Sequence, residues 1–142
     1  MSESASKEVG DLLIKIYHLL RVRRDDVLRE SGLTTPQYAA LATLSTEPGL
    51  SAAALARRCT VTPQTMAGIV ANLLEAGLIA REPDPEHGRI LKTSLMPQGV
   101  DILRRTGKAV RSVDEKMLAE LDRAEREAFA DLLAQCTRAL EL

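Results

Sequence analysis

The sequence predicts a mainly α-helical protein with one small β-hairpin. Apolar residues recur at helical spacing over long runs near both ends of the chain. Proline stands where helices are expected to begin, at Pro36, Pro63 and Pro97. One short stretch, 78–95, alternates apolar and polar residues around a loop rich in proline and glycine. With 142 residues and 45% apolar content, a single packed domain spanning 1–142 is expected.

The N-terminal part predicts two helices. Apolar residues follow a helical period from Lys7 to Arg24, and the pattern fades through Leu28. Thr35 is expected to cap the second helix, with Pro36 at its first position. The residues expected on the inner side of that helix are Tyr38, Leu41 and Leu44. Glu47, Pro48 and Gly49 end it.

Residues 51–77 predict two helices joined by a tight turn. Ser51 caps a short first helix that runs through Leu55 to Arg58, and 59–61 form the turn. Thr62 caps the second helix, and Gly77 ends it as a left-handed cap, with Leu78 folded back on the helix. The buried face of the second helix is predicted to hold Met66, Ile69, Val70, Leu73 and Leu74. Its opposite face is small and polar: Gln64, Thr65, Gly68, Ala71 and Asn72.

After this pair, two strands are predicted at Leu78–Glu82 and Arg89–Leu95, joined by the loop 83–88. A helix-turn-helix followed by a hairpin is a winged helix-turn-helix. Such a motif reads double-stranded DNA by placing its second helix in the major groove. The DNA-binding part is therefore expected to span 33–96.

The C-terminal part predicts two further helices. Pro97 begins the first of them, and Met96 occupies its cap position without a capping hydroxyl. Leu103, Val110 and Met117 recur at heptad intervals, a seam that favours helix association. Asp122 and Glu125 form a capping box for the last helix, which holds Phe129, Leu132, Leu133, Cys136 and Leu140. The segments 6–30 and 97–142 leave amphipathic surface that predicts a symmetric homodimer.

Composition narrows the classes of function. Aromatic residues are 2% of the chain, too few for the stacking platforms of single-strand binders. The net charge of −1 means that any DNA contact relies on local charge. The sequence has no signal-peptide core and no apolar run long enough for a membrane span, so a cytoplasmic protein is expected. The histidines and cysteines show no ligand spacing, which predicts no metal, no cofactor and no enzyme.

Several of these residues together resemble the MarR family of bacterial transcription regulators. They are Leu50, Ser51, Leu55, Ala56, Val61, Thr62, Pro63, Leu73, Gly77, Leu78, Pro83, Asp84, Pro85, Gly88, Arg89 and Gly99. The resemblance implies a dimer whose terminal helices form the interface. It also implies a ligand-responsive regulator, expected to be a repressor that binds an inverted-repeat operator and is released by a small effector.

The expected DNA contacts lie on the second helix of the motif and on the wing. Gln64 pairs well with adenine, and the hydroxyls of Thr62 and Thr65 suit phosphates or base edges. By resemblance Arg89 enters the minor groove. The full expected set is Ser51, Thr62, Pro63, Gln64, Thr65, Arg89 and Lys92, with Arg57 and Arg58 as further phosphate contacts.

Two positions depart from the family. Gly68 replaces a contact residue that is commonly basic or polar, and His87 stands where an aspartate usually pairs with the wing arginine. The expected wing salt bridge is therefore absent or replaced. Together with the net charge of −1, these departures suggest an alternative: a winged-helix protein-interaction module that has lost specific DNA binding.

An effector site is implied between the terminal helices and the DNA-binding part. Tyr17, His18, Arg21 and Tyr38 are the candidates for the polar walls around a small aromatic or anionic ligand. Some family members sense peroxide through a cysteine in the first helix, where this chain has none. Inert burial is therefore expected for Cys59 and Cys136, with an intersubunit bridge at Cys136 as the lesser alternative.

Overall fold

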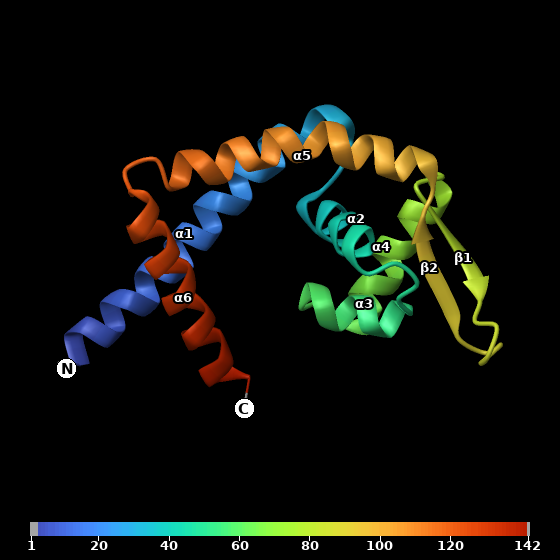
Figure 1. The fold of residues 1–142 in the computed structure, drawn as a ribbon, viewed down its shortest axis with the longest axis horizontal. Helices are drawn as coiled ribbons and strands as arrows, with labels where there is room; N and C mark the ends of the chain where they lie inside the picture. The colour runs from blue at the N-terminus through green and yellow to red at the C-terminus, as the bar shows by residue number, and fades with distance from the viewer. Residues whose placement is uncertain (1–2, 142) are drawn as a thin grey trace.

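The computed structural model describes residues 3–141 and is mainly helical with one antiparallel hairpin, which confirms the predicted fold class. Figure 1 shows two regions, an arm of long helices and a more compact part that ends in the hairpin. The arm consists of α1 (Glu3–Leu28), α5 (Pro97–Met117) and α6 (Arg123–Leu140). The compact part, called the reader below, consists of α2 (Thr35–Thr46), α3 (Ala52–Cys59), α4 (Pro63–Glu75), β1 (Ile79–Pro83) and β2 (Leu91–Leu95). A single 3₁₀ turn, Arg29–Ser31, follows α1.

Within the arm, α1 packs against α5, and both helices also contact α2 of the reader. Arg24 of α1 donates two hydrogen bonds from Nη2 to the carboxylate of Asp114 on α5, at 2.8 and 2.9 Å. Bidentate guanidinium–carboxylate pairs fix orientation as well as adding energy. This pair therefore helps to fix how α1 and α5 lie against each other.

Side-chain hydrogen bonds cap the starts of α2, α3, α4 and α6, and one of these caps differs from the expectation. The N-cap of α2 is Thr34, whose Oγ1 accepts a hydrogen bond from the Gln37 N–H at 3.3 Å. The Gln37 side chain accepts from the Thr34 N–H at 3.0 Å and completes a capping box. The predicted cap, Thr35, is wrong by one residue because its hydroxyl donates instead to the carboxylate of Asp25 on α1. The predicted caps Ser51, Thr62 and Asp122 are confirmed.

The reader packs around a hydrophobic core to which the arm helices α1 and α5 also contribute. Met66, Ile69, Val70 and Leu73 of α4 are buried against residues of α1, α2 and α3 that include Leu28, Leu41, Leu44 and Leu55. Leu74, which was predicted to be buried, is 36% exposed, because it lies about 100° around the helix from Leu73. Gly77 has φ +74°, and the N–H of Leu78 donates to the Leu73 carbonyl at 3.0 Å, as predicted for a left-handed cap.

The wing is a two-stranded ladder in which Ile79 pairs with Leu95 and Pro83 with Leu91. Thr93 also bridges to Leu50, which attaches the hairpin to the segment between α2 and α3. Both strands begin later than predicted, and Arg89 lies in the loop rather than in β2. Asp84 explains the difference. Its carboxylate accepts the N–H of Glu86 at 2.8 Å, and its own N–H donates to the Ile90 carbonyl at 2.8 Å, which closes a wide loop.

The start of α5 is confirmed at Pro97, with Met96 as an N-cap that makes no side-chain hydrogen bond. The helix ends at Met117 and does not extend to Leu121. Its predicted heptad seam is partly used within the chain, because Val110 is buried in the core and Leu103 packs against it. None of the described helices is long and apolar enough to cross a membrane.

Candidate DNA-binding interface and effector cavity

The first turn of α4 brings together four of the predicted DNA contacts. Thr62, Pro63, Gln64 and Thr65 are all exposed there. Thr62 Oγ1 accepts the Thr65 N–H at 3.1 Å and donates its proton to Thr65 Oγ1 at 2.9 Å. The Thr65 hydroxyl therefore keeps its own proton for an outside acceptor, such as a phosphate oxygen or a base edge.

The rest of the outer face of α4 is small. Gly68, Ala71 and Asn72 are exposed, and a Cβ added at Gly68 would meet nothing within 4 Å. Packing within the chain therefore does not require glycine at this position. Ser51, the remaining predicted contact on the helices, lies at the start of α3, where its Oγ accepts the Ala54 N–H at 3.2 Å.

The other two predicted contacts lie on the wing, where one is exposed and the other is ion-paired. Arg89 is exposed in the loop, whereas Lys92 Nζ lies 3.5 Å from the Asp84 carboxylate. The wing salt bridge expected beside Arg89 is thus replaced by the pair Lys92–Asp84. The N–H of Glu86 lowers the pKa of Asp84 most, burial opposes this shift, and the His87 N–H and Lys92 lower it further. Asp84 therefore stays ionised and holds Lys92 on the wing.

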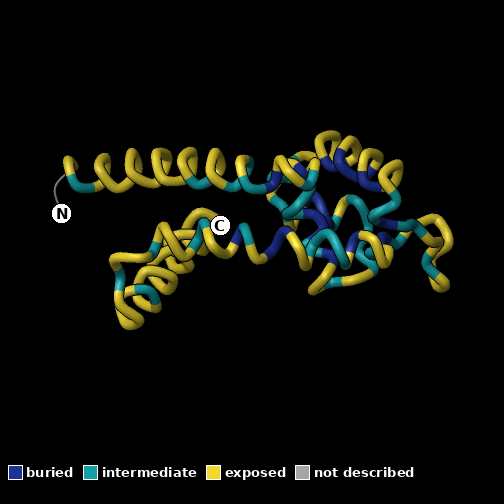
Figure 2. Tube along the Cα trace, turned by 90° about the horizontal axis from the view of Figure 1, so that it is seen from above, coloured by how far each residue is buried: buried dark blue, intermediate teal, exposed yellow. Residues whose placement is uncertain are grey.

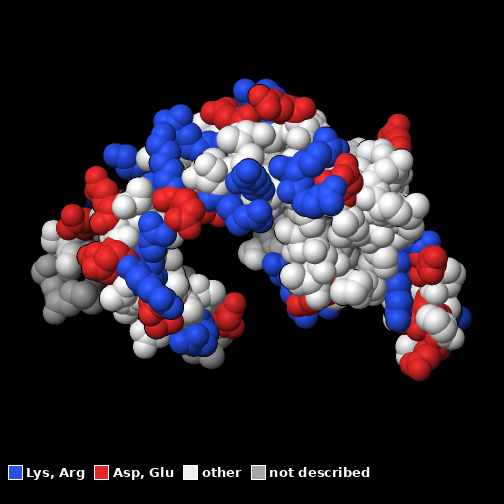
Figure 3. All heavy atoms as spheres, turned by 45° about the horizontal axis from the view of Figure 1, so that its top comes forward, with Lys and Arg blue, Asp and Glu red and all other residues white. Residues whose placement is uncertain are grey.

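The remaining basic residues of the reader also differ in their availability. Arg58 Nε donates to Glu47 at 2.9 Å, so part of its charge is already neutralised. Arg57 is exposed and pairs with no carboxylate of the described chain. On the face seen in Figure 3, basic and acidic side chains form separate small groups, and much of the compact part of the molecule carries no charge. Among these residues, Arg57 is therefore more available to a phosphate than Arg58.

Sequence reasoning missed Arg81 of β1. The two buried side-chain atoms that lack a hydrogen-bond partner within residues 3–141 are Arg81 Nε and Thr93 Oγ1. These residues are direct cross-strand partners, so their side chains share one face of the hairpin. Strand alternation from the buried Ile79 would have placed Arg81 on that inner face.

The four predicted effector residues lie in three different places. Tyr17 and Arg21 of α1 line a cavity of about 500 Å³ with Thr35, Pro36 and Ala39 of α2, with 59–61 and with Ile69. Arg21 Nε is 3.9 Å from the Asp25 carboxylate, a loose pair. This space, called the α1 cavity below, touches the turn of the helix-turn-helix directly.

Tyr38 lines a second cavity, of about 320 Å³, between α2, β2 and α5. Arg104, Gly107 and Arg111 of α5 lie in the same wall. A Cβ on Gly107 would stand 3.1 Å from Arg111 Nη1 and 3.6 Å from the Tyr38 hydroxyl, so the glycine leaves room for both groups. His18 is exposed on α1 and lines neither cavity.

The cysteines do not share one environment. Cys59 is half-buried, with its Sγ 3.7 Å from Thr43 Oγ1. Cys136 is exposed, which contradicts the predicted burial, because the groove it lines between α1 and α6 is open in a single copy of the chain. Within the described residues no cluster of His, Cys, Asp and Glu could hold a metal ion.

Comparison with known proteins agrees with this arrangement. A sequence model described as the MarR family matches residues 31–90. The transcriptional repressor Rv2887 of Mycobacterium tuberculosis is 36% identical over 88% of this chain and 90% of its own length. The chain belongs to the MarR family. Like the other members, it is a DNA-binding transcription regulator.

Solved structures of that relative match along most of the chain. A crystal structure of the M. tuberculosis protein in complex with p-aminosalicylic acid gives a TM-score of 0.74 at 34% identity, covering 90% of this chain and 97% of the other. A crystal structure of the same protein with DNA gives 0.73 at 33% identity, covering 89% and 95%.

Proposed function

We propose that the protein is a dimeric, ligand-responsive repressor that binds an inverted-repeat operator. The observation that carries the proposal is the exposed first turn of α4, capped by Thr62, with Gln64 and Thr65 free to meet bases and Arg89 exposed on the adjoining wing. The similarity to a named repressor that has been crystallised with DNA supports it.

The dimer is proposed from the apolar faces that the arm leaves open. Val9, Leu12 and Leu13 of α1 are at least 40% exposed, and Leu132 of α6 is 61% exposed. With the other residues of the groove between α1 and α6, they form an almost wholly apolar surface. A second copy related by two-fold symmetry covers such a surface and presents two α4 helices about 34 Å apart, one turn of DNA.

The α1 cavity is proposed as the effector site. Arg21 offers a loosely held cation and Tyr17 a phenol, which suit an aromatic ring that carries a carboxylate. The M. tuberculosis relative has been solved with salicylic acid, a ligand of this class. A carboxylate at Arg21 competes with Asp25, whose other oxygen accepts the N–H of Thr35 at the start of α2. Ligand binding thereby favours another angle between arm and reader and lowers DNA affinity.

DNA binding and release by the effector are tested by titrating the protein into a fluorescent duplex that has been selected from a random DNA library. Salicylate is expected to weaken binding by the wild-type protein. Arg21→Gln should still bind the duplex but need at least about tenfold more salicylate for release, since one charge-assisted contact is lost. The matched control Arg111→Gln, in the second cavity, should respond like the wild type. A shift in Arg111→Gln alone would move the effector site there.

The alternative, an interaction module without specific DNA binding, draws support from Lys92 and Arg58, which are already ion-paired. Arg89→Ala separates the two functions. Repressor function requires the variant to lose DNA affinity, whereas an interaction module would bind selected and scrambled duplexes equally weakly before and after the change.

A further inference from the structure

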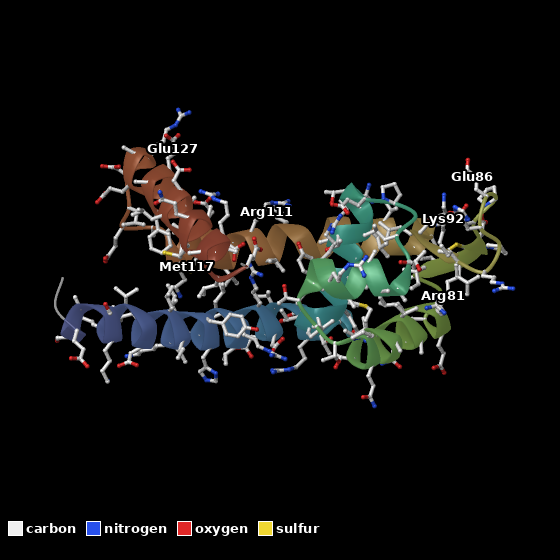
Figure 4. The ribbon with its side chains drawn as sticks, turned by 90° about the horizontal axis from the view of Figure 1, so that it is seen from below. Arg81, Glu86, Lys92, Arg111, Met117 and Glu127 are labelled. Carbon is white, nitrogen blue, oxygen red and sulfur yellow. The ribbon has the colours of Figure 1, made fainter. Side chains whose placement is uncertain are left out.

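The seam between α4 and the wing holds one cation whose contacts the chain does not complete. Arg81 projects from β1 beside α4, against which β1 packs. Figure 4 shows it between α4 and the hairpin, apart from Lys92 and Glu86 on the wing. Its Nε is buried and has no hydrogen-bond partner among the residues that the structure describes. A buried donor without a partner is costly, and it marks Arg81 as a side chain that packing within the chain does not explain.

Neighbouring groups leave the charge of Arg81 uncompensated. Thr93, opposite Arg81 on β2, is fully buried, and its hydroxyl makes no hydrogen bond within the described part of the chain. The nearest acids along the strand are Glu82, whose cross-strand partner is Lys92, and Asp84, which is ion-paired with Lys92. No carboxylate within residues 3–141 forms an ion pair with Arg81. Arg81 as a whole is only half-buried, so its guanidinium can meet an external anion through the Nη groups and not through the buried Nε.

The way a winged helix docks determines which anion that is. The recognition helix occupies the major groove, about 12 Å wide, and the wing reaches the minor groove, about 6 Å wide. One phosphate strand separates the two grooves. With α4 in one groove and Arg89 in the other, that strand must cross the seam between them, where Arg81 lies.

We propose that Arg81 binds a backbone phosphate of the operator at the ridge between the two grooves. The inference rests on DNA binding through α4 and the wing. The contact fixes how deeply the recognition helix enters the groove and carries no sequence information of its own, because phosphates are alike at every base pair. Arg81 is then a positioning contact, distinct from the base-reading Gln64.

The test compares Arg81→Gln, Arg81→Lys and Arg81→Met on a duplex selected from a random library, by fluorescence anisotropy over a salt series. The control Arg123→Gln removes the same charge from α6, where the side chain is 92% exposed. Arg81→Gln and Arg81→Met should lower affinity about three- to tenfold at about 0.1 M salt and reduce the salt slope by about one. Arg81→Lys should retain most of both, and Arg123→Gln should change neither.

Two further measurements distinguish a phosphate contact from a purely structural role of Arg81. Discrimination between selected and scrambled duplex should stay within about twofold in every Arg81 variant, because the contact is with phosphate. The thermal midpoint should fall little in Arg81→Met, which keeps an apolar stem over Thr93. An unchanged salt slope in Arg81→Gln would overturn the proposal, as would a loss of discrimination. If the wild-type protein selects no duplex, DNA binding itself fails, which is a separate result.

Discussion

The reader and the arm use the same kinds of apolar side chain in opposite ways. In the reader, Leu41 and Leu55 are fully buried within one copy of the chain. In the arm, Leu132 and Val9 are more than half exposed, as the exposed stretches of α1 and α6 in Figure 2 also show. The core of the reader, to which Leu28 of α1 and Val110 of α5 also belong, is thus complete within one copy of the chain, whereas the free faces of the arm call for a second copy. The predictions below test that contrast.

The largest effect is expected from truncating the core of the reader. Leu73→Ala removes a 1% exposed side chain from the face of α4 that packs on α2 and α3, and should lower the free energy of unfolding by about 2–5 kcal/mol. The matched variant Leu132→Ala, in the arm, should lower the free energy of unfolding by less when both variants are measured at the same high protein concentration. Urea unfolding of the two variants measures both. If both variants lost the same free energy of unfolding at every protein concentration, the contrast between reader and arm would be contradicted.

The next effect concerns association. Leu132→Glu places a charge in the open groove of the arm and should weaken dimerisation by at least about tenfold, because an unpaired carboxylate resists burial. Sedimentation velocity over a range of concentrations measures the dissociation constant. The amides of α4, which report on the folding of the reader, should stay protected from hydrogen exchange. A variant that remains a dimer with wild-type affinity would exclude this groove from the interface.

A smaller pair of changes tests the helix starts. Thr62→Ala removes the cap of α4 and should cost about 1 kcal/mol of stability, with weaker DNA binding because the first turn frays. Met96→Ser supplies the hydroxyl that α5 lacks and should add up to about 1 kcal/mol. Thermal unfolding of both variants checks the signs. Opposite signs would show that these caps do not control the two helices.

The smallest effect is the response of the wing to pH. The pKa of Asp84 is lowered in the folded chain, so its contribution to stability is present above the unfolded pKa and is lost as pH falls through the folded value. The wing loop should therefore loosen only below about pH 4. Amide exchange at Glu86, whose N–H is bonded to Asp84, follows this change. Asp84→Asn should bring the loosening to neutral pH without altering exchange in α1.

Local chemistry explains how much the sequence could predict. Caps, turns and helical periods depend on residues within a few positions, so α4, its Thr62 cap and Gly77 were predicted correctly. The cap of α2 was misplaced because the contact that decides it, Thr35 with Asp25, joins different helices. Charge pairing is likewise set by the fold. The pair Lys92–Asp84, and the lack of an ion pair at Arg81 within residues 3–141, depend on the hairpin register, which composition does not contain.

The candidate effector residues were likewise predicted only in part, because the fold decides which of them share a cavity. Tyr17 and Arg21 lie one helical turn apart and share a cavity, as a sequence-level pairing allows. Tyr38 is separated from them because α2 presents it to α5 instead, a choice made by packing around Gly107. Their roles in ligand binding, and those of the DNA contacts, stay predictions until the variants above are measured.

The central claim is that two readers joined by the arms act on one operator, and a single titration tests it most directly. Fluorescence anisotropy would compare a selected inverted repeat with the same duplex in which one half-site is scrambled. Simultaneous engagement of both α4 helices predicts binding about a hundredfold or more tighter to the intact repeat. Equal affinity for the two duplexes would contradict a two-headed repressor and favour a reader that acts alone or a surface that binds protein.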